Sequence, residues 1–212
     1  MVEYIDEISD HIRETETALL PEYGYMKKQR DINEKMRAIL VDWLIEVHYK
    51  FKLNAETLFI TISIIDRYLS IEQVKRQYLQ LVGVTAMLIA SKYEDIYPPP
   101  IQDFIYITDN AYTQKDILDM EYDILKKLDF KVTMPSPWVF LNRFSKLAKA
   151  DSVTTALARY LVELPLIEYR MLKYSPSMVA ASAVYVAFHV LKKRINWGAT
   201  LQDATKYSES QI

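Results

Sequence analysis

The chain has 212 residues, of which 50% are hydrophobic, with a formal net charge of −2 and a pI near 6.0. This composition can fill a dry core, and its near-neutral charge gives no electrostatic reason to expect nucleic-acid binding. Cysteine is absent, which excludes disulfides, thiolate metal sites and cysteine nucleophiles. No apolar run reaches the roughly 18 residues of a membrane span, and the chain does not begin with the pattern of a signal peptide.

Helical spacing predominates along the chain, which predicts an all-α fold. Only three glycines occur, and no Asn-Gly or Asp-Gly hairpin signal is present. Apolar residues recur at helical spacing between the breakers. Six helices are predicted in the first part. Four of them cover 3–17, 33–52, 78–93 and 101–107. Another is capped by Asn54 and includes Leu69, and the last is opened by Thr113 and Asp116 with a capping box.

After Pro135 the pattern begins again, which predicts two helical repeats. Ser136-Pro137 and Ser175-Pro176 each indicate a helix start with proline at the first helical position. Between them a helix is predicted over 152–164, which Pro165 would kink or stop. The helix at 78–93 and the helix after Ser175 are both rich in small residues. Each is therefore predicted to lie at the centre of its repeat.

The helix at 33–52 carries more apolar surface than one packing stripe requires. Met36, Ile39, Leu40 and Trp43 share a stripe, while Val41 lies well round from it. Two explanations remain open: the helix is buried centrally, or part of its apolar surface binds a partner.

Residues with catalytic or metal-binding chemistry form no recognisable pattern. Histidine occurs only at His11, His48 and His189, without metal-ligand spacing. Neither a Gly-rich phosphate loop nor a nucleophile elbow is present. The adjacent acids Glu94 and Asp95 are interpreted as a solvated helix end. The sequence therefore predicts no catalytic residue, no metal site and no cofactor.

A series of motifs runs through nearly the whole chain. The series is Met36–Leu44, Ile65–Leu69, Leu79–Gly83, Ala90–Asp95, Ile96–Pro99, Tyr106–Asp109 and Met120-Glu121. In order and spacing it resembles the cyclin family, and specifically the mitotic B-type group with its close A-type relatives. Val47–Phe51 and Trp138–Leu141 favour the B-type.

The resemblance implies two five-helix cyclin boxes preceded by an N-terminal helix. Residues 1–30 would form the N-terminal helix and linker, 31–132 the first box and 133–212 the second box. Because the family continues beyond the position of Ile212, the second box is expected to be incomplete.

The resemblance also implies a function: a non-catalytic subunit that binds and activates a cyclin-dependent Ser/Thr protein kinase in G2/M control. Such a subunit binds the arrangement in which the kinase's C helix and activation loop are correctly placed, and so shifts the population toward it. The kinase-binding residues that it implies are Tyr4, Ile8, Lys92, Tyr93, Glu121, Leu125, Phe130 and Val132. The residue pattern alone favours an exposed ion pair for Lys92 and Glu121. It favours a buried stripe of an amphipathic helix for Tyr4 and Ile8.

The second implied site is an apolar docking groove for substrates or inhibitors with Arg-x-Leu motifs. Its residues would be Met36, Ile39, Leu40, Trp43, Glu46, Leu79 and Gln80. Glu46 would pair with a basic residue of the peptide, and Gln80 would bond its backbone. Arg37 and Asp66 are implied to join two helices and are excluded from both sites. Arg37–Leu40 also matches a minimal degron, but it lies in a helix that the fold requires.

Two other classes of protein are alternatives to this interpretation. Cyclin-like repeats occur in DNA-binding transcription initiation factors and in retinoblastoma-type pockets, and the near-neutral charge disfavours the DNA-binding class. A helical hydrolase or synthase has no recognisable motif in support. Neither nucleic acid nor membrane is expected as a partner. A nuclear and cytoplasmic location is expected from the family, and the absence of cysteine fits a reducing compartment.

Overall fold

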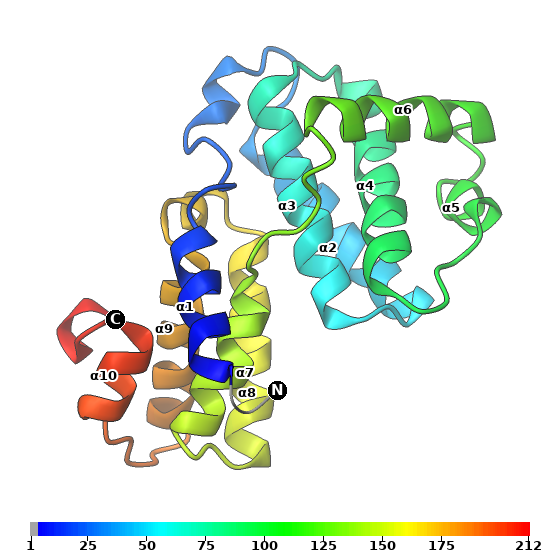
Figure 1. Ribbon diagram of the computed structural model, residues 1–212. Helices are drawn as coiled ribbons and strands as arrows, with labels where there is room; N and C mark the ends of the chain where they lie inside the picture. Colours follow the sequence, from blue (N-terminus) through cyan, green and yellow to red (C-terminus); the bar gives the residue numbers. More distant parts are fainter. Residues whose placement is uncertain (1–3) are drawn as a thin grey trace. The chain divides into compact units, whose positions relative to one another are not determined.

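The computed structural model describes residues 4–212, except for the side chain of Asp6, and the regular elements within that range are all helices (Figure 1). The all-α prediction is therefore confirmed for the described residues. The predicted helix of residues 3–17 is observed as α1, Ile5–Thr15, and its first predicted residue lies outside the described range. None of the described helices is both long enough and apolar enough to cross a lipid bilayer.

The chain folds into two compact units. Residues 19–134 form the first unit. The second unit joins the described residues up to Ala18 to residues 135–212. Helix α1 therefore belongs to the same unit as the C-terminal part of the chain, although the first unit separates them in the sequence.

The first unit is built around α4. Its α-helices are α2 (Glu34–Phe51), α3 (Ala55–Ile71), α4 (Leu79–Glu94), α5 (Ile101–Ile107) and α6 (Gln114–Lys127). The other helices of the unit all pack against α4 (Figure 1), and every residue from 81 to 91 is buried. Small residues such as Ala86 and Ala90 permit this close approach from several sides. The prediction of a central helix in this repeat is confirmed.

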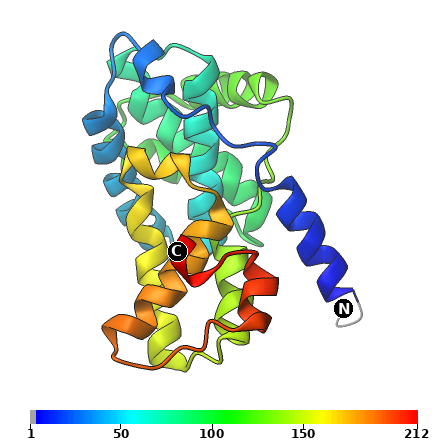
Figure 2. The ribbon, with the colours of Figure 1, turned by 90° about the vertical axis from the view of Figure 1, so that its left-hand side faces the viewer.

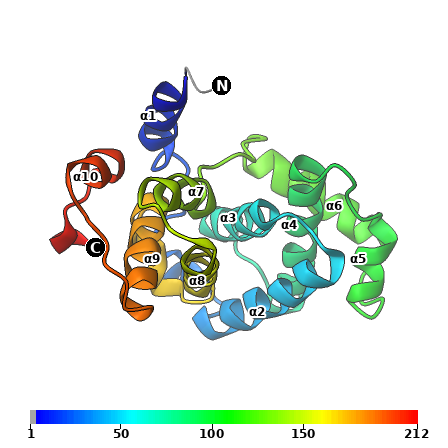
Figure 3. The ribbon, with the colours of Figure 1, turned by 90° about the horizontal axis from the view of Figure 1, so that it is seen from below.

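The second unit has its own central helix, α9. Its α-helices are α1, α7 (Pro137–Leu147), α8 (Ser152–Glu163), α9 (Pro176–Val190) and α10 (Ala199–Thr205). Helices α7, α8 and α10 pack against α9 (Figures 2 and 3), whose alanines are buried. Helix α8 ends at Glu163, close to the predicted end, and a short 3-10 helix containing Pro165 follows.

The four helices with a predicted capping residue all begin directly after it. Thr113 and Asp116 form the capping box of α6. Ser136 and Ser175 cap α7 and α9, each accepting a backbone hydrogen bond through its hydroxyl. Asn54 precedes α3 as predicted, but its side chain makes no capping hydrogen bond.

Asp95, directly after α4, contacts the start of α3. Its Oδ1 accepts the backbone N–H of Asn54 at 2.9 Å, and its Oδ2 accepts the Thr57 hydroxyl at 2.7 Å. The carboxylate therefore places negative charge at the positive end of α3. Asp95 ends α4 and is partly exposed, as the interpretation of Glu94-Asp95 as a solvated helix end implies, and its contacts with α3 are what that interpretation did not include.

The second unit makes the equivalent connection with the charges reversed. Asp151 caps α8 by accepting the backbone N–H of Thr154 at 2.9 Å. Lys193, shortly after α9, donates to the Asp151 carboxylate at 2.5 Å and to the Thr154 hydroxyl at 2.9 Å. These hydrogen bonds, that of Lys193 first, hold the pKa of Asp151 below its usual range. In both units the end of the central helix is thus fastened to the start of the helix beside it.

A buried ion pair joins α2 to α3. Arg37 donates from Nε to Asp66 Oδ1 at 2.6 Å and from Nη2 to Oδ2 at 2.7 Å, and both side chains are 1% exposed. The Tyr25 hydroxyl donates to the same carboxylate at 2.7 Å. Burial alone would lower the pKa of Arg37, but the charge and the hydrogen bonds of Asp66, with a smaller contribution from Tyr25, together outweigh burial and raise the pKa. The predicted structural pairing of Arg37 with Asp66 is confirmed.

Candidate functional site

Lys92 and Glu121 form an ion pair at the surface of the first unit. Lys92 lies in the last turn of α4, and its Nζ is 2.7 and 3.0 Å from the two carboxylate oxygens of Glu121 on α6. The Lys92 side chain is 47% exposed, whereas that of Glu121 is 15% exposed. Such a pair adds only about 0–1 kcal/mol to stability. What the geometry provides is an ammonium group held in one place, with donors left for another molecule.

Helix α6 is fixed by a further contact near Glu121. The Tyr68 hydroxyl of α3 donates to Asp123 at 2.6 Å. Burial and this hydrogen bond raise the pKa of Tyr68 well above its ordinary value, so the phenol stays neutral and continues to donate. Because Glu121 lies two residues away on the same helix, the partner of Lys92 is carried on a rigid element.

Aromatic side chains are exposed beside this pair and after α6. Tyr93 follows Lys92 and is exposed, and its hydroxyl contacts the hydroxyl of Thr133. Phe130 is 68% exposed. Its φ of 56° is left-handed, as is that of Asp129, a conformation that costs a non-glycine residue about 1–2 kcal/mol. The Phe130 N–H donates to the Leu125 carbonyl at 2.9 Å and stabilises the turn.

The remaining predicted kinase-binding residues are divided between the units. Leu125 and Val132 are partly exposed in the first unit. Tyr4 and Ile8 lie one helical turn apart at the start of α1 in the second unit, and about half of each is exposed. They are therefore not a fully buried stripe.

Six of the predicted docking residues line one open groove of about 280 Å³ between α2 and α4. They are Met36, Ile39, Leu40, Trp43, Leu79 and Gln80. Leu40 and Leu79 are buried, and Ile39 is exposed. Glu46 is exposed three residues beyond Trp43 on α2 and is not among the lining residues.

Close approach of α4 to α2 forms the base of this groove. A Cβ atom added to Gly83 would lie 2.7 Å from Cδ1 of Leu40, which is too close for two carbon atoms. The absence of a side chain at Gly83 therefore lets Leu40 pack directly on the α4 backbone.

Arg76 also lines the groove, and the sequence prediction missed it. It begins a short 3-10 helix, Arg76–Tyr78, and its backbone N–H donates to Asp31 at 2.7 Å. Arg76 precedes Leu79 by three residues and Gln80 by four. If the helical periodicity of α4 is extended toward the N-terminus, it places Arg76 on the same face as these two residues and so predicts it as a groove residue. Within residues 4–212, no group of three or more His, Cys, Asp or Glu residues could hold a metal ion.

The sequence matches two domain families. The family described as "Cyclin, N-terminal domain" covers residues 7–133, and "Cyclin, C-terminal domain" covers residues 135–212. Cyclin-B2-2 from Oryza sativa subsp. indica is 49% identical over 212 residues, 100% of this chain and 51% of that protein. Cyclin-B1-2 from Arabidopsis thaliana is 49% identical over 100% of this chain and 47% of that protein. The G2/mitotic-specific cyclin-2 of Medicago sativa is 48% identical over 100% of this chain and 65% of that protein. The chain spans about half the length of the first two relatives.

Solved structures share the fold. A viral cyclin from herpesvirus saimiri superposes with a TM-score of 0.86 at 20% identity, over 96% of this chain and 91% of the viral one. A chain of the yeast RNA Pol II CTD kinase CTDK-1 complex gives a TM-score of 0.69 at 14% identity, over 95% of this chain and 67% of that chain. These likenesses confirm the predicted architecture.

Proposed function

The chain belongs to the cyclin family, and from this premise we propose that it is a non-catalytic activating subunit of a cyclin-dependent protein kinase. The observation that carries the proposal is the Lys92–Glu121 pair, which holds an exposed ammonium group next to exposed Tyr93 on a rigid helical unit. Similarity to a chain of a yeast kinase complex supports a kinase as the partner. The names of G2/mitotic-specific relatives support a role in G2/M control.

The proposed mechanism is a shift of the kinase between two states. The chain binds the form in which the C helix and the activation loop are correctly placed. Moving a kinase from mostly inactive to mostly active requires roughly 5 kcal/mol of differential binding. A preformed surface supplies this more readily than a flexible segment, because a flexible segment loses conformational entropy on binding. Lys92 would donate to backbone carbonyls of the kinase while Glu121 keeps its amine in position.

Reconstitution tests this proposal. The purified chain, titrated into monomeric cyclin-dependent kinases, is expected to raise phosphorylation of a histone-type substrate by at least about a hundredfold with its proper partner. The chain without a kinase should give no phosphorylation. If no kinase of a broad panel is stimulated or bound, the proposal is wrong.

We also propose that the groove between α2 and α4 recruits Arg-x-Leu substrates or inhibitors to the bound kinase. Its apolar lining suits the leucine. Glu46 lies beyond Trp43 on α2, and Arg76 lines the groove itself. These opposite charges would fix the direction of a bound peptide, with its basic residue toward Glu46.

The double variant Met36→Ala/Trp43→Ala tests the docking proposal. It is expected to raise KM about tenfold or more for a substrate that carries the motif, because docking raises the effective substrate concentration. Activity on a short peptide without the motif should be unchanged. Val190→Ala, which shortens an exposed apolar side chain outside the groove, is the control. Equal loss on both substrates would argue against a separate docking site.

A further inference from the structure

Helix α1 lies over a groove that its own apolar side chains do not fill. The groove has a volume of about 1090 Å³ and lies between α1, α7 and α10. Ile5, Ile8 and Ile12 line it from α1, and Phe140 and Phe144 line it from α7. Close packing of an amphipathic face usually fixes a helix of this length. Here that packing is incomplete, so polar contacts must set the direction of α1.

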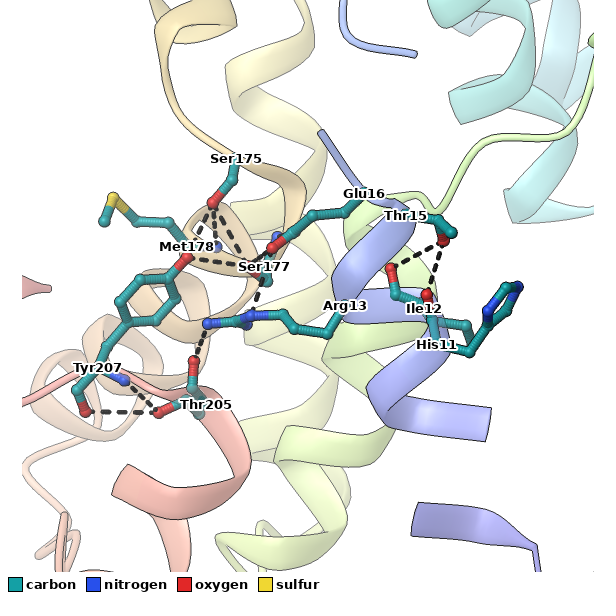
Figure 4. Close-up of polar contacts among 10 residues, drawn as sticks. All are labelled: His11, Ile12, Arg13, Thr15, Glu16, Ser175, Ser177, Met178, Thr205 and Tyr207. Atoms are coloured by element: carbon teal, nitrogen blue, oxygen red, sulfur yellow. Dashed lines mark hydrogen bonds and ion pairs between the residues drawn. The ribbon is translucent and has the colours of Figure 1, made fainter. Parts of the chain in front are cut away.

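The buried end of α1 is fastened to α9 by Glu16 (Figure 4). The Glu16 carboxylate accepts the backbone N–H of Ser177 at 3.0 Å and the Ser177 hydroxyl at 2.9 Å. Glu16 is 4% exposed and Ser177 is fully buried. Ser177 is the second residue of α9, where backbone N–H groups lack partners within the helix and a negative charge is favoured. Glu16 therefore caps a helix that begins far away in the sequence.

Arg13 completes the fastening from the preceding turn of α1. Its Nε lies 3.3 Å from Glu16 Oε1, and its Nη2 donates to the Thr205 carbonyl at the end of α10. Its guanidinium also lies 4.6 Å from the ring centroid of Tyr207. The Tyr207 hydroxyl in turn hydrogen-bonds with Ser177 at 2.9 Å (Figure 4). We call Arg13, Glu16, Ser177 and Tyr207 the α1 latch.

At the other end of α1, Arg143 of α7 is the tether. It donates to the Ile5 carbonyl at 2.9 Å and to the Ser9 hydroxyl. The exposed residues Tyr4 and Ile8 are close to this end. Because Tyr4 is 12 residues from Glu16, roughly 18 Å of helix separates them. The latch and the tether therefore hold α1 at two distant points, which together define the direction of its axis.

We propose that the latch residues are positioning residues for the kinase: they set the direction in which α1 presents Tyr4 and Ile8. This rests on the proposed function, and it assigns a role in kinase binding to groups that act through the direction of α1. The latch belongs wholly to the second unit, so the C-terminal part of the chain governs an N-terminal contact.

The test compares Glu16→Ala with two matched variants of the full chain. Glu16→Ala should lower kinase affinity about tenfold, since only a fraction of the molecules would then hold α1 correctly. Glu16→Gln should lose less, because its amide oxygen can still accept the Ser177 N–H. Glu14→Ala, an exposed carboxylate on the same helix, should leave affinity unchanged. Equal affinity of Glu16→Ala and the unaltered chain would overturn the proposal.

A mutant cycle separates orientation from general stability. In a Tyr4→Ala/Ile8→Ala background, Glu16→Ala should cause no further loss of kinase affinity, although its effect on Tm should be the same in both backgrounds. If Glu16→Ala lowers affinity by the same factor in both, it acts independently of α1 and the proposal is wrong.

A measurement without kinase keeps the latch separate from the proposed function. The chain has no cysteine, so His11→Cys offers a single exposed labelling site on α1. The anisotropy of a fluorophore there should fall in Glu16→Ala and stay constant in Glu14→Ala. Constant anisotropy in both overturns the latch even for a chain that activates a kinase. If no kinase is activated, the proposed function fails, and a fall in anisotropy still supports orientation of α1 by the latch.

Discussion

Asp66→Ala is expected to lower the free energy of unfolding by about 3–5 kcal/mol, because it strands the charge of Arg37 inside the first unit. Both side chains are 1% exposed, and two short hydrogen bonds join them. The variant also deprives the Tyr25 hydroxyl of the carboxylate to which it donates. Urea unfolding monitored by circular dichroism measures the change.

The double variant Arg37→Met/Asp66→Leu identifies the cause. It removes both charges and keeps apolar volume, so it should lose less stability than Asp66→Ala alone. Glu72→Ala is the control, since it breaks an exposed pair with Lys127 of similar length, 2.6 Å. A loss in Asp66→Ala no larger than that in the control would mean that the buried pair does not hold α2 against α3.

Lys92→Glu is expected to weaken kinase binding about a hundredfold while leaving the helical content unchanged. The substitution removes a donor and places a second carboxylate beside Glu121. Losing one partner of a charge pair that a complex buries costs about 2–5 kcal/mol. The fold should tolerate the change, because about half of the Lys92 side chain faces solvent. Calorimetric titration of the chain with the kinase that it activates measures the affinity.

Lys127→Glu is the matched control for this variant. Lys127 is also a lysine near a helix end, and it pairs with Glu72, the residue that follows α3. The helical spacing from Leu125 puts Lys127 on the opposite side of α6. The affinity of Lys127→Glu for the kinase should equal that of the unaltered chain. If both variants bind as well as the unaltered chain, Lys92 is not in the interface.

Local signals in the sequence predicted most helix starts and both central helices. Thr113, Ser136 and Ser175 cap neighbouring backbone groups, so their effect is visible within four residues of sequence. The small residues of α4 and α9 likewise indicate close approach without naming the partner. The family resemblance added the pairing of Arg37 with Asp66, which no local pattern contains.

Several contacts between distant segments were not revealed by the sequence. Asn54 has the residue type of a cap, yet its side chain makes no capping hydrogen bond and its backbone N–H donates to Asp95. Glu16 looks like one more acid of an amphipathic helix, and only the fold places it against Ser177. Such partners are chosen by packing geometry, so local residue preferences do not identify them.

The reversed charges of the two helix fastenings also bear on how a duplicated fold avoids exchanging its parts. If α4 docked against α8 during folding, the carboxylate of Asp95 would meet that of Asp151, with repulsion in place of an ion pair. If α9 docked against α3, the ammonium group of Lys193 would face the backbone N–H of Asn54 in place of a carboxylate, and the ion pair would be lost. The two fastenings therefore favour docking of each central helix against the neighbour from its own repeat, although the two repeats share one architecture.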